Sequence, residues 1–360
     1  MRAPLLLPLA TSTLLATSLL TSCSQPAPEE PLIVVEELPL YDFESAAPWY
    51  PCPEAPLDER VVVVEALSGV DQYFGEENRR SVRAPVTFPQ GDWQQVGLRF
   101  ELECPENGLC DHWDRTGSLG LILNPDAPEA DQHEVELLRH ITPYRRGMCQ
   151  YVDLTPLAGL LTGERALHSF IDTWVGPGHD QGEGWRVSAR FEFSPGYAEQ
   201  ADQVIPLIGR RNITVGEADP SVDDQLEAMR FELPETFSRV EAHLTTTGHS
   251  FGNTLNCAEF CPMRHDLLVN AQSFSINPWR ADCAQNPVSP QAGTWQYPRN
   301  GWCPGAVTVG DRVDITAAVQ PGENQLDLDI LLADGSEYTN TSPVDLLPST
   351  AVALKLYVWH

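Results

Sequence analysis

The sequence predicts an all-β protein with two β-sandwich domains. Apolar residues alternate with polar ones at a period of two in most apolar segments, and clusters of Gly, Pro and Asn separate these segments. The chain has 31 prolines in 360 residues, which exceeds the usual share of about 5% and favours short strands over long helices. Short strands with one solvated face, joined by turns, are typical of sandwiches and jelly rolls. At about 150 residues per domain, the length favours two domains.

The alternation places the individual strands. Residues 185–193 carry Trp, Val, Ala, Phe and Phe at alternate positions, and residues 324–331 alternate Leu and Ile with Asp. Shorter runs of the same kind predict strands at residues 61–66, 96–102, 135–138, 167–175, 240–246, 265–269, 313–318 and 352–359. The polar stretch over residues 194–202, which contains Ser-Pro-Gly, is the best internal boundary. We therefore expect an N-terminal domain over residues 57–196 and a C-terminal domain over residues 197–360.

The chain is strongly acidic, with 22 basic and 51 acidic residues and a formal net charge of −29. This balance excludes a nucleic-acid partner, because nucleic-acid binding draws most of its affinity from Lys and Arg. A hydrophobic fraction of 42% and a mean hydropathy of −0.24 also argue against a disordered or multispanning chain.

Residues 1–22 predict an export signal. Arg2 is followed by an apolar segment from Leu5 to Leu20, too short and too interrupted by Ser and Thr for a spanning helix. Small residues then precede Cys23, as in a bacterial lipoprotein signal, so we expect Cys23 to be lipidated; an ordinary cleaved signal peptide is the alternative. Residues 23–56, rich in Pro and Glu, predict a tether. Attachment by lipid alone places the protein at the bacterial outer membrane or cell surface, with the periplasm also possible.

Eight further cysteines support an oxidising compartment. An even number in an exported chain predicts up to four disulfides, whose pairing cannot be deduced from spacing. A zinc site is the weaker alternative, because the sequence has no CxxC pair and no closely paired histidines near the cysteines. We expect no metal and no cofactor. These cysteines are Cys52, Cys104, Cys110, Cys149, Cys257, Cys261, Cys283 and Cys303.

Four predicted loops concentrate polar and aromatic residues: 104–115, 171–174, 247–265 and 293–305. Each has an ordinary structural explanation, since neighbouring Asp and Arg usually form surface ion pairs of little energy and tryptophans at strand ends usually belong to the core. Glu259 is the better candidate for a functional residue, because it lies inside the short span between Cys257 and Cys261 and has little freedom to move.

Taken in order, these segments resemble the peptide N-glycosidase F family of bacterial amidases, which remove N-linked glycans. The likeness covers about residues 58–310. It is carried by Cys104 through Asp114-Arg115, Ile141-Thr142-Pro143-Tyr144, Thr173-Trp174, Gly248-His249, Cys257-Ala258-Glu259, His265, Asn286-Pro287 and the run from Arg299 to Gly305.

The resemblance implies two jelly-roll domains side by side, with the site at their interface. It also implies the disulfides Cys104–Cys110, Cys257–Cys261 and Cys283–Cys303, and leaves Cys52 and Cys149 as the remaining pair. The family's principal catalytic aspartate corresponds to Asp114, its loop glutamate to Glu259 and its other acidic residue to Asp172. The family has Glu at position 172 and Trp at position 260, so this chain departs from it at two positions of the site.

The resemblance also implies the chemistry, which is hydrolysis of the amide that joins an asparagine side chain to a sugar. An amide is a poor electrophile, so a carboxylate must activate water. We expect Asp114 to be this base, and Asp172 and Glu259 to position the water and the first sugar. The remaining expectations are that Arg115 orients Asp114 or the carbonyl, that Arg299 binds substrate polar groups, that Trp113, Trp174 and Trp302 stack on sugars, and that His249 is a hydrogen-bonding wall residue. The expected partner is an N-glycoprotein or glycopeptide, bound by a monomer.

Three other functions stay open at this point. A carbohydrate-binding lipoprotein without activity would keep the aromatic residues and lose the catalytic geometry. A copper monooxygenase of similar shape would need paired histidines and a Met ligand, and the paired histidines are absent from the sequence. A glycoside hydrolase would use two carboxylates but would cut between sugars.

Overall fold

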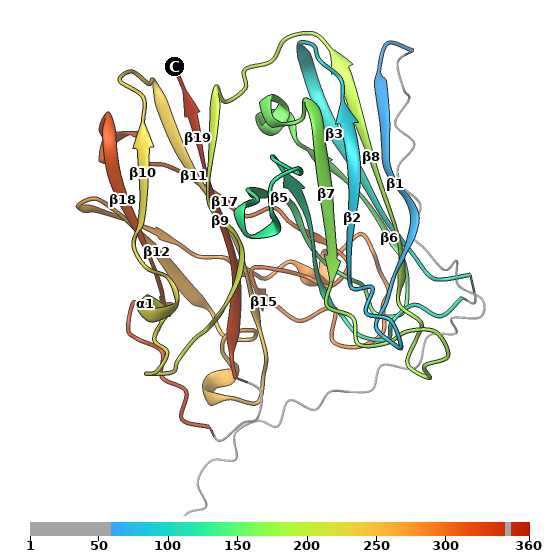
Figure 1. Ribbon diagram of the computed structural model, residues 1–360. Helices are drawn as coiled ribbons and strands as arrows, with labels where there is room; N and C mark the ends of the chain where they lie inside the picture. Colours follow the sequence, from blue (N-terminus) through green and yellow to red (C-terminus); the bar gives the residue numbers. More distant parts are fainter. Residues whose placement is uncertain (1–58, 107, 343–346) are drawn as a thin grey trace, which may run out of the picture. The chain divides into compact units, whose positions relative to one another are not determined.

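The computed structural model describes residues 59–106, 108–342 and 347–360. The predicted signal, Cys23, the tether and Cys52 lie outside these residues. The regular structure of the described part is nearly all β (Figure 1), and none of its helices is long and apolar enough to cross a membrane.

Two antiparallel sheets form the first sandwich, and the strands that they take from residues 62–195 are drawn in blue to green in Figure 1. Their inward side chains make one core, in which Phe100, Phe191 and Trp185 are fully buried. The first sheet has the order β1 (Val62–Gln72), β8 (Trp185–Pro195), β3 (Trp93–Glu103), β6 (Met148–Asp153). The second has the order β16 (Val307–Thr308), β5 (Glu134–Ile141), β4 (Thr116–Ile122), β7 (Gly163–Ile171), β2 (Ser81–Phe88).

Two four-stranded antiparallel sheets form the second sandwich, around a separate core that includes Met263, Leu267 and Leu354. The first has the order β17 (Asp311–Asp314), β11 (Arg239–His249), β19 (Ser349–Trp359), β9 (Gln203–Thr214). The second has the order β10 (Met229–Leu233), β18 (Gly322–Leu332), β12 (Met263–Val269), β13 (Gln272–Ile276). A two-stranded ribbon of β14 (Trp279–Arg280) and β15 (Arg299–Asn300) and one short helix, α1 (Val222–Gln225), complete the described elements used below.

The chain passes between the sandwiches more than once. It leaves β8 at Pro195 and enters β9 at Gln203, which brackets the boundary expected at residue 196. Strand β16 then returns from the second half of the chain to the first sandwich, where Val307 pairs with His140 of β5. The exact domain limits stay a prediction, because β16 belongs by sequence to one half and by pairing to the other.

The predicted strand at residues 313–318 is wrong in its second half. Strand β17 ends at Asp314, whose carboxylate accepts a hydrogen bond from the Thr316 backbone N–H at 2.9 Å, and Thr316–Ala318 forms a short 3₁₀ turn. The side chain of Asp314 thus competes with the sheet for the backbone.

The three disulfides that the resemblance implied are present: Cys104–Cys110, Cys257–Cys261 and Cys283–Cys303. Cys149 is also disulfide-bonded. Its expected partner, Cys52, lies outside the described residues.

Candidate active site

Two carboxylates from opposite sandwiches lie on either side of one guanidinium. Asp114 is on the loop between β3 and β4, and Glu259 is inside the Cys257–Cys261 loop that precedes β12. The Nε atom of Arg299 lies 3.2 Å from Glu259 Oε1, and its Nη2 atom lies 3.7 Å from Asp114 Oδ2. Arg299 is 0% exposed, so its guanidinium contacts the two acidic groups from inside the protein and does not reach into solvent.

The loop that carries Asp114 is fixed by a second aspartate. Asp111 is fully buried and accepts hydrogen bonds from the Trp113 backbone N–H at 3.0 Å and from Thr173 Oγ1 at 2.7 Å. It also accepts from Arg115 Nε at 2.8 Å. The expectation that Arg115 orients Asp114 is therefore corrected, since the hydrogen bonds of its guanidinium go to Asp111. Burial raises the pKa of Asp114, and the charge of Arg115 is the smallest of the effects that oppose this change.

A chain of hydroxyl groups connects Arg299 to Asp114. Arg299 Nη2 donates to Thr294 Oγ1 at 2.7 Å, and the Tyr144 hydroxyl donates to Asp114 Oδ2 at 2.7 Å. The Thr294 and Tyr144 oxygens lie 3.1 Å apart, and since the Tyr144 proton is used on Asp114, Thr294 is the donor between them. Burial raises the pKa of Tyr144 well above 10.0, which keeps this hydroxyl a donor.

The aromatic residues near Arg299 are part of its support. The Arg299 guanidinium lies 4.7 Å from the ring of Trp302 and 5.0 Å from the ring of Phe260. Trp302 is only 2% exposed and donates from Nε1 to the Gly248 carbonyl at 2.6 Å. We expected Trp302 to stack on sugars and Arg299 to bind substrate, and the structure corrects both expectations because it buries both side chains.

His249 borders the site as a neutral ring. It forms hydrogen bonds with Thr247 Oγ1 at 2.8 Å and Thr116 Oγ1 at 3.2 Å, and its ring lies 5.4 Å from that of Trp302. Burial, assisted by the charge of Arg139, lowers the pKa of His249 to about 3. A ring that stays unprotonated at neutral pH suits the expected wall residue and not a general acid.

The remaining predicted residues form an exposed rim. Trp113 is 49% exposed and donates from Nε1 to Gln181 at 3.1 Å. Trp174 is 52% exposed, with the Arg80 guanidinium 4.4 Å from its ring. Both rings therefore have faces available to a ligand, as expected for sugar stacking.

Asp172 is partly exposed, and its side chain pairs with Arg80. Its side chain is 44% exposed and pairs with Arg80 at 3.2 Å, while its backbone N–H donates to Thr116 at 2.9 Å. The structure thus brings Asp114 and Glu259 together across Arg299, whereas the contacts of Asp172 tie it to Arg80.

Burial perturbs both central carboxyls. Burial raises the pKa of Asp114, and the charge of Arg299 opposes this change. Burial raises the pKa of Glu259 to about 8, with the charge of Asp114 as the second cause and Arg299 again opposing. Two acids held this close separate their titrations, so that one keeps its proton over a pH range in which the other is ionised.

Sequence reasoning missed Asp111, Thr294 and the role of Tyr144. Asp111 and Asp114 stand in one short acidic segment, and charge alone does not distinguish the buried anchor from the reactive carboxylate. Tyr144 lies in the Ile141-Thr142-Pro143-Tyr144 motif of the resemblance, and this motif was the one sequence feature that pointed to a functional role for it. Within the described ranges, no group of three or more His, Cys, Asp or Glu side chains is arranged to hold a metal ion.

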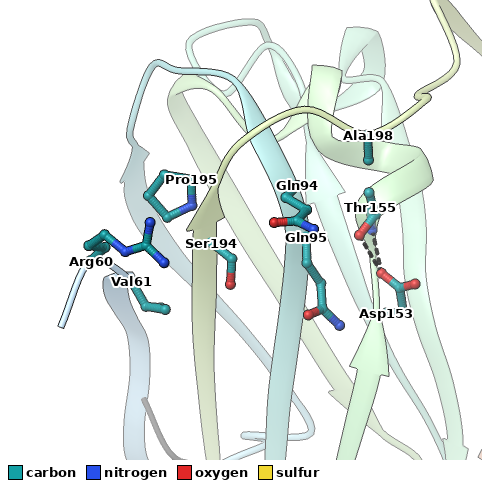
Figure 2. A pocket seen from close by; sticks show the side chains of 9 residues that line it. All are labelled: Arg60, Val61, Gln94, Gln95, Asp153, Thr155, Ser194, Pro195 and Ala198. Carbon is teal, nitrogen blue, oxygen red and sulfur yellow. Dashed lines mark hydrogen bonds between the residues drawn. The ribbon is translucent and has the colours of Figure 1, made fainter. Parts of the chain in front are cut away.

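A separate cavity of about 510 Å³ lies at the start of β3, at the other end of that strand from the Asp114 loop. Figure 2 shows that Gln94, Gln95 and Ser194 line it together with Arg60 and Asp153. Its acidic residue, Asp153, accepts hydrogen bonds from the Thr155 backbone and hydroxyl. We assign no catalytic role to this cavity, because its carboxylate is already engaged.

Comparison with known proteins shows what the chain is similar to. The family described as peptide-N-glycosidase F, C terminal, matches residues 219–344. The peptide-N(4)-(N-acetyl-beta-D-glucosaminyl)asparagine amidase F of Elizabethkingia miricola is 27% identical over 280 residues, which cover 72% of this chain and 74% of the relative. Both matches support the resemblance of this chain to the peptide-N-glycosidase F family. The resemblance that the loop motifs carried thus agrees with the comparisons.

Solved structures of peptide-N-glycosidase F share the fold. The structure of PNGase F, a glycosylasparaginase from Flavobacterium meningosepticum, superposes with a TM-score of 0.69 at 21% identity, covering 83% of this chain and 96% of that chain. PNGF-II superposes with a TM-score of 0.65 at 15% identity, covering 84% of this chain and 66% of that chain. The prediction of an all-β protein with two jelly-roll domains is confirmed.

Proposed function

We propose that this protein is an active peptide-N-glycosidase, which hydrolyses the amide between an asparagine side chain and the first sugar of an N-linked glycan. The observation that carries the proposal is the pairing of Asp114 and Glu259 across the buried Arg299, within the family's fold. The relative from Elizabethkingia miricola bears the name of an asparagine amidase.

Asp114 acts as the general base. Its ionised carboxylate, held by Tyr144, accepts a proton from the water that attacks the amide carbonyl. Glu259 keeps a proton near neutral pH and donates it as the carbon–nitrogen bond breaks. Water supplies the oxygen of the new aspartate and the leaving group departs as the glycosylamine, so the reaction balances without a metal or a redox partner.

The rim supplies recognition. Trp113 and Trp174 present exposed ring faces on which sugars stack, and Asp172 binds a sugar hydroxyl while held by Arg80. Because Asp172 is one methylene shorter than the family's Glu, its reach toward the first sugar is reduced. The substrate class is an N-glycoprotein or glycopeptide, and a lipid on Cys23 would present the enzyme at the bacterial surface.

Digestion of a glycopeptide in heavy-oxygen water tests the activity. The expected product is a peptide in which Asp replaces Asn and carries the isotope, with the whole glycan released. The Asp114→Asn variant should bind the glycopeptide and leave it intact. A sugar left on the asparagine would indicate a glycosidase, and binding by the wild-type protein with no cleavage would indicate a carbohydrate-binding protein; either result would overturn the proposal.

A further inference from the structure

A second cavity lies where the two sandwiches meet. Its volume is about 460 Å³, and it is lined from one side by β4, β5 and β7 and from the other by β9. Strands β5 and β9 are in contact there, as Figure 1 also shows. The lining residues include Ser118, Glu134, His168, Phe170 and Arg210.

Arg210 is the arginine of this cavity, and no carboxylate of the described residues forms an ion pair with it. Its guanidinium lies 4.8 Å from the Phe170 ring, and its Nε atom is enclosed without a hydrogen-bond partner. Within the described residues, no ion pair or hydrogen bond of this side chain is present. A partly buried cation whose donors are unused is costly, because contact with an aromatic ring does not replace the lost hydration.

The carboxylates near Arg210 pair with other basic side chains. Glu134 lies 2.8 Å from His168 Nδ1, and Glu136 lies 2.8 Å from the Arg139 guanidinium. Asp172 pairs with Arg80 on the rim. The donors of Arg210 are therefore left for a group that the chain itself does not supply.

The backbone of β9 is shaped to present this residue. Ile208 pairs with Leu354 and Arg211 with Val352, so Gly209 and Arg210 together oppose the single residue between those partners. This arrangement is a β-bulge, which re-aims a side chain and is frequent next to active sites. A Cβ atom at Gly209 would lie 3.2 Å from the Glu134 carbonyl oxygen, so glycine allows β9 to approach β5 closely.

We propose that this cavity, the Arg210 subsite, binds an oxyanion carried by the substrate, through charge-assisted hydrogen bonds from the Arg210 guanidinium. The inference rests on the proposed function for the identity of the substrate. The shared chemistry is a carboxylate, phosphate or sulfate, borne either by an acidic sugar of the glycan or by an acidic residue of the peptide. A planar guanidinium matches such groups by donating two parallel hydrogen bonds.

The location and the overall charge support this role. Burial lowers the pKa of Arg210 to about 10, and the charge of Asp172 is among those that oppose this change. After burial and Arg139, the charge of Arg210 also lowers the pKa of His249, so the subsite is within electrostatic range of the candidate active site. A formal net charge of −29 repels an acidic substrate. A guanidinium with no direct ion-pair partner would offset that repulsion locally.

Binding measurements in the Asp114→Asn protein test the inference without cleavage. Calorimetric titration would compare three glycopeptides: one neutral, one with sialic acid on the glycan, and one with a neutral glycan and Asp beside the glycosylated Asn. We expect one acidic form to bind about tenfold more tightly than the neutral form, and the form that gains affinity identifies the source of the oxyanion. Inorganic sulfate should compete with it.

Arg210→Met in the same background should abolish this preference and leave the affinity for the neutral peptide unchanged. Arg211→Gln is the matched control, because Arg211 is the exposed neighbour on β9, and it should keep the preference. Equal affinity for all three peptides, or an equal loss in both variants, would overturn the inference even if the enzyme cleaves normally. A lack of cleavage by the wild type would instead bear on the proposed function.

Stability provides an independent readout. Removing an uncompensated charge while keeping an apolar stem against Phe170 should leave the melting temperature of Arg210→Met equal to or above that of the wild type. A clearly lower melting temperature would indicate a structural role and contradict the proposal. Should Arg210→Met not fold, Arg210→Lys, which keeps the charge without the planar fork, should retain only part of the preference.

Discussion

The raised pKa of Glu259 predicts that this residue contributes to the pH dependence of the folded state. In the fold Glu259 keeps its proton up to about pH 8, whereas an ordinary glutamate loses it near 4.5. Between these values the folded chain binds more protons than the unfolded chain, so its free energy of unfolding falls as the pH rises. The stabilisation is fully present below the unfolded pKa and is lost as the pH rises through the folded pKa.

Glu259→Gln removes this dependence. The amide has no proton to lose, and its oxygen can still accept the hydrogen bond from Arg299 Nε. One pKa unit corresponds to about 1.4 kcal/mol. The free energy of unfolding of the wild type should therefore fall by about 4 kcal/mol relative to the variant between pH 5 and pH 8.

Urea denaturation at pH 5, 6, 7 and 8 measures this difference. Glu164→Gln, at an exposed glutamate of β7, is the matched control and should follow the wild type at every pH. Parallel curves for the wild type and Glu259→Gln would refute the reasoning, because they would mean that Glu259 titrates alike in the folded and unfolded chains.

Three further outcomes are expected. Initial rates of glycan release measured from pH 5 to pH 10 should decline above about pH 8 as Glu259 ionises, and a flat alkaline limb would argue against its role as acid. Arg299→Lys should lower the free energy of unfolding in urea by about 3 kcal/mol, because a single ammonium cannot replace the hydrogen bonds to Glu259 and Thr294. The variant should also lose the release of glycan. A variant with the stability of the wild type would contradict this prediction. Asp172→Glu, which restores the family's side chain, should raise kcat/KM about tenfold with little change in melting temperature, whereas a fall in rate would mean that Asp172 is already suited to its own substrate.

The sequence predicted the strands whose two faces differ. Residues 185–193 and 324–331 alternate because one face of β8 and β18 is buried and the other is more exposed. Strand β4 was missed because nearly all of its residues are buried, so its two faces do not differ in polarity. Ser118, for example, is buried although it lines the cavity between β4 and β9. Strand β2 contains Pro85, which a sheet tolerates there because β2 is at the edge.

The sequence was sufficient to predict which acidic residues meet in the candidate site. Asp114 and Glu259 follow from the motifs, and the structure places both beside Arg299. Whether a side chain binds ligand or supports another side chain depends on burial, which a motif does not encode. Trp302 and Arg299 were therefore expected to face the substrate, although the fold uses them as support.

Buried polar contacts between the sandwiches set the geometry on which the site depends. Arg139 of β5 donates to Thr247 Oγ1 at 3.1 Å and to the Ala351 carbonyl at 3.0 Å, both in the second sandwich. Lys355 of β19 donates in the other direction, to the Glu136 carbonyl at 3.1 Å. Apolar contacts between two sheets tolerate sliding, whereas buried donors must keep their partners or lose a full hydrogen bond each. These bonds therefore favour one orientation of the two sandwiches, the orientation in which Asp114 and Glu259 face a common guanidinium.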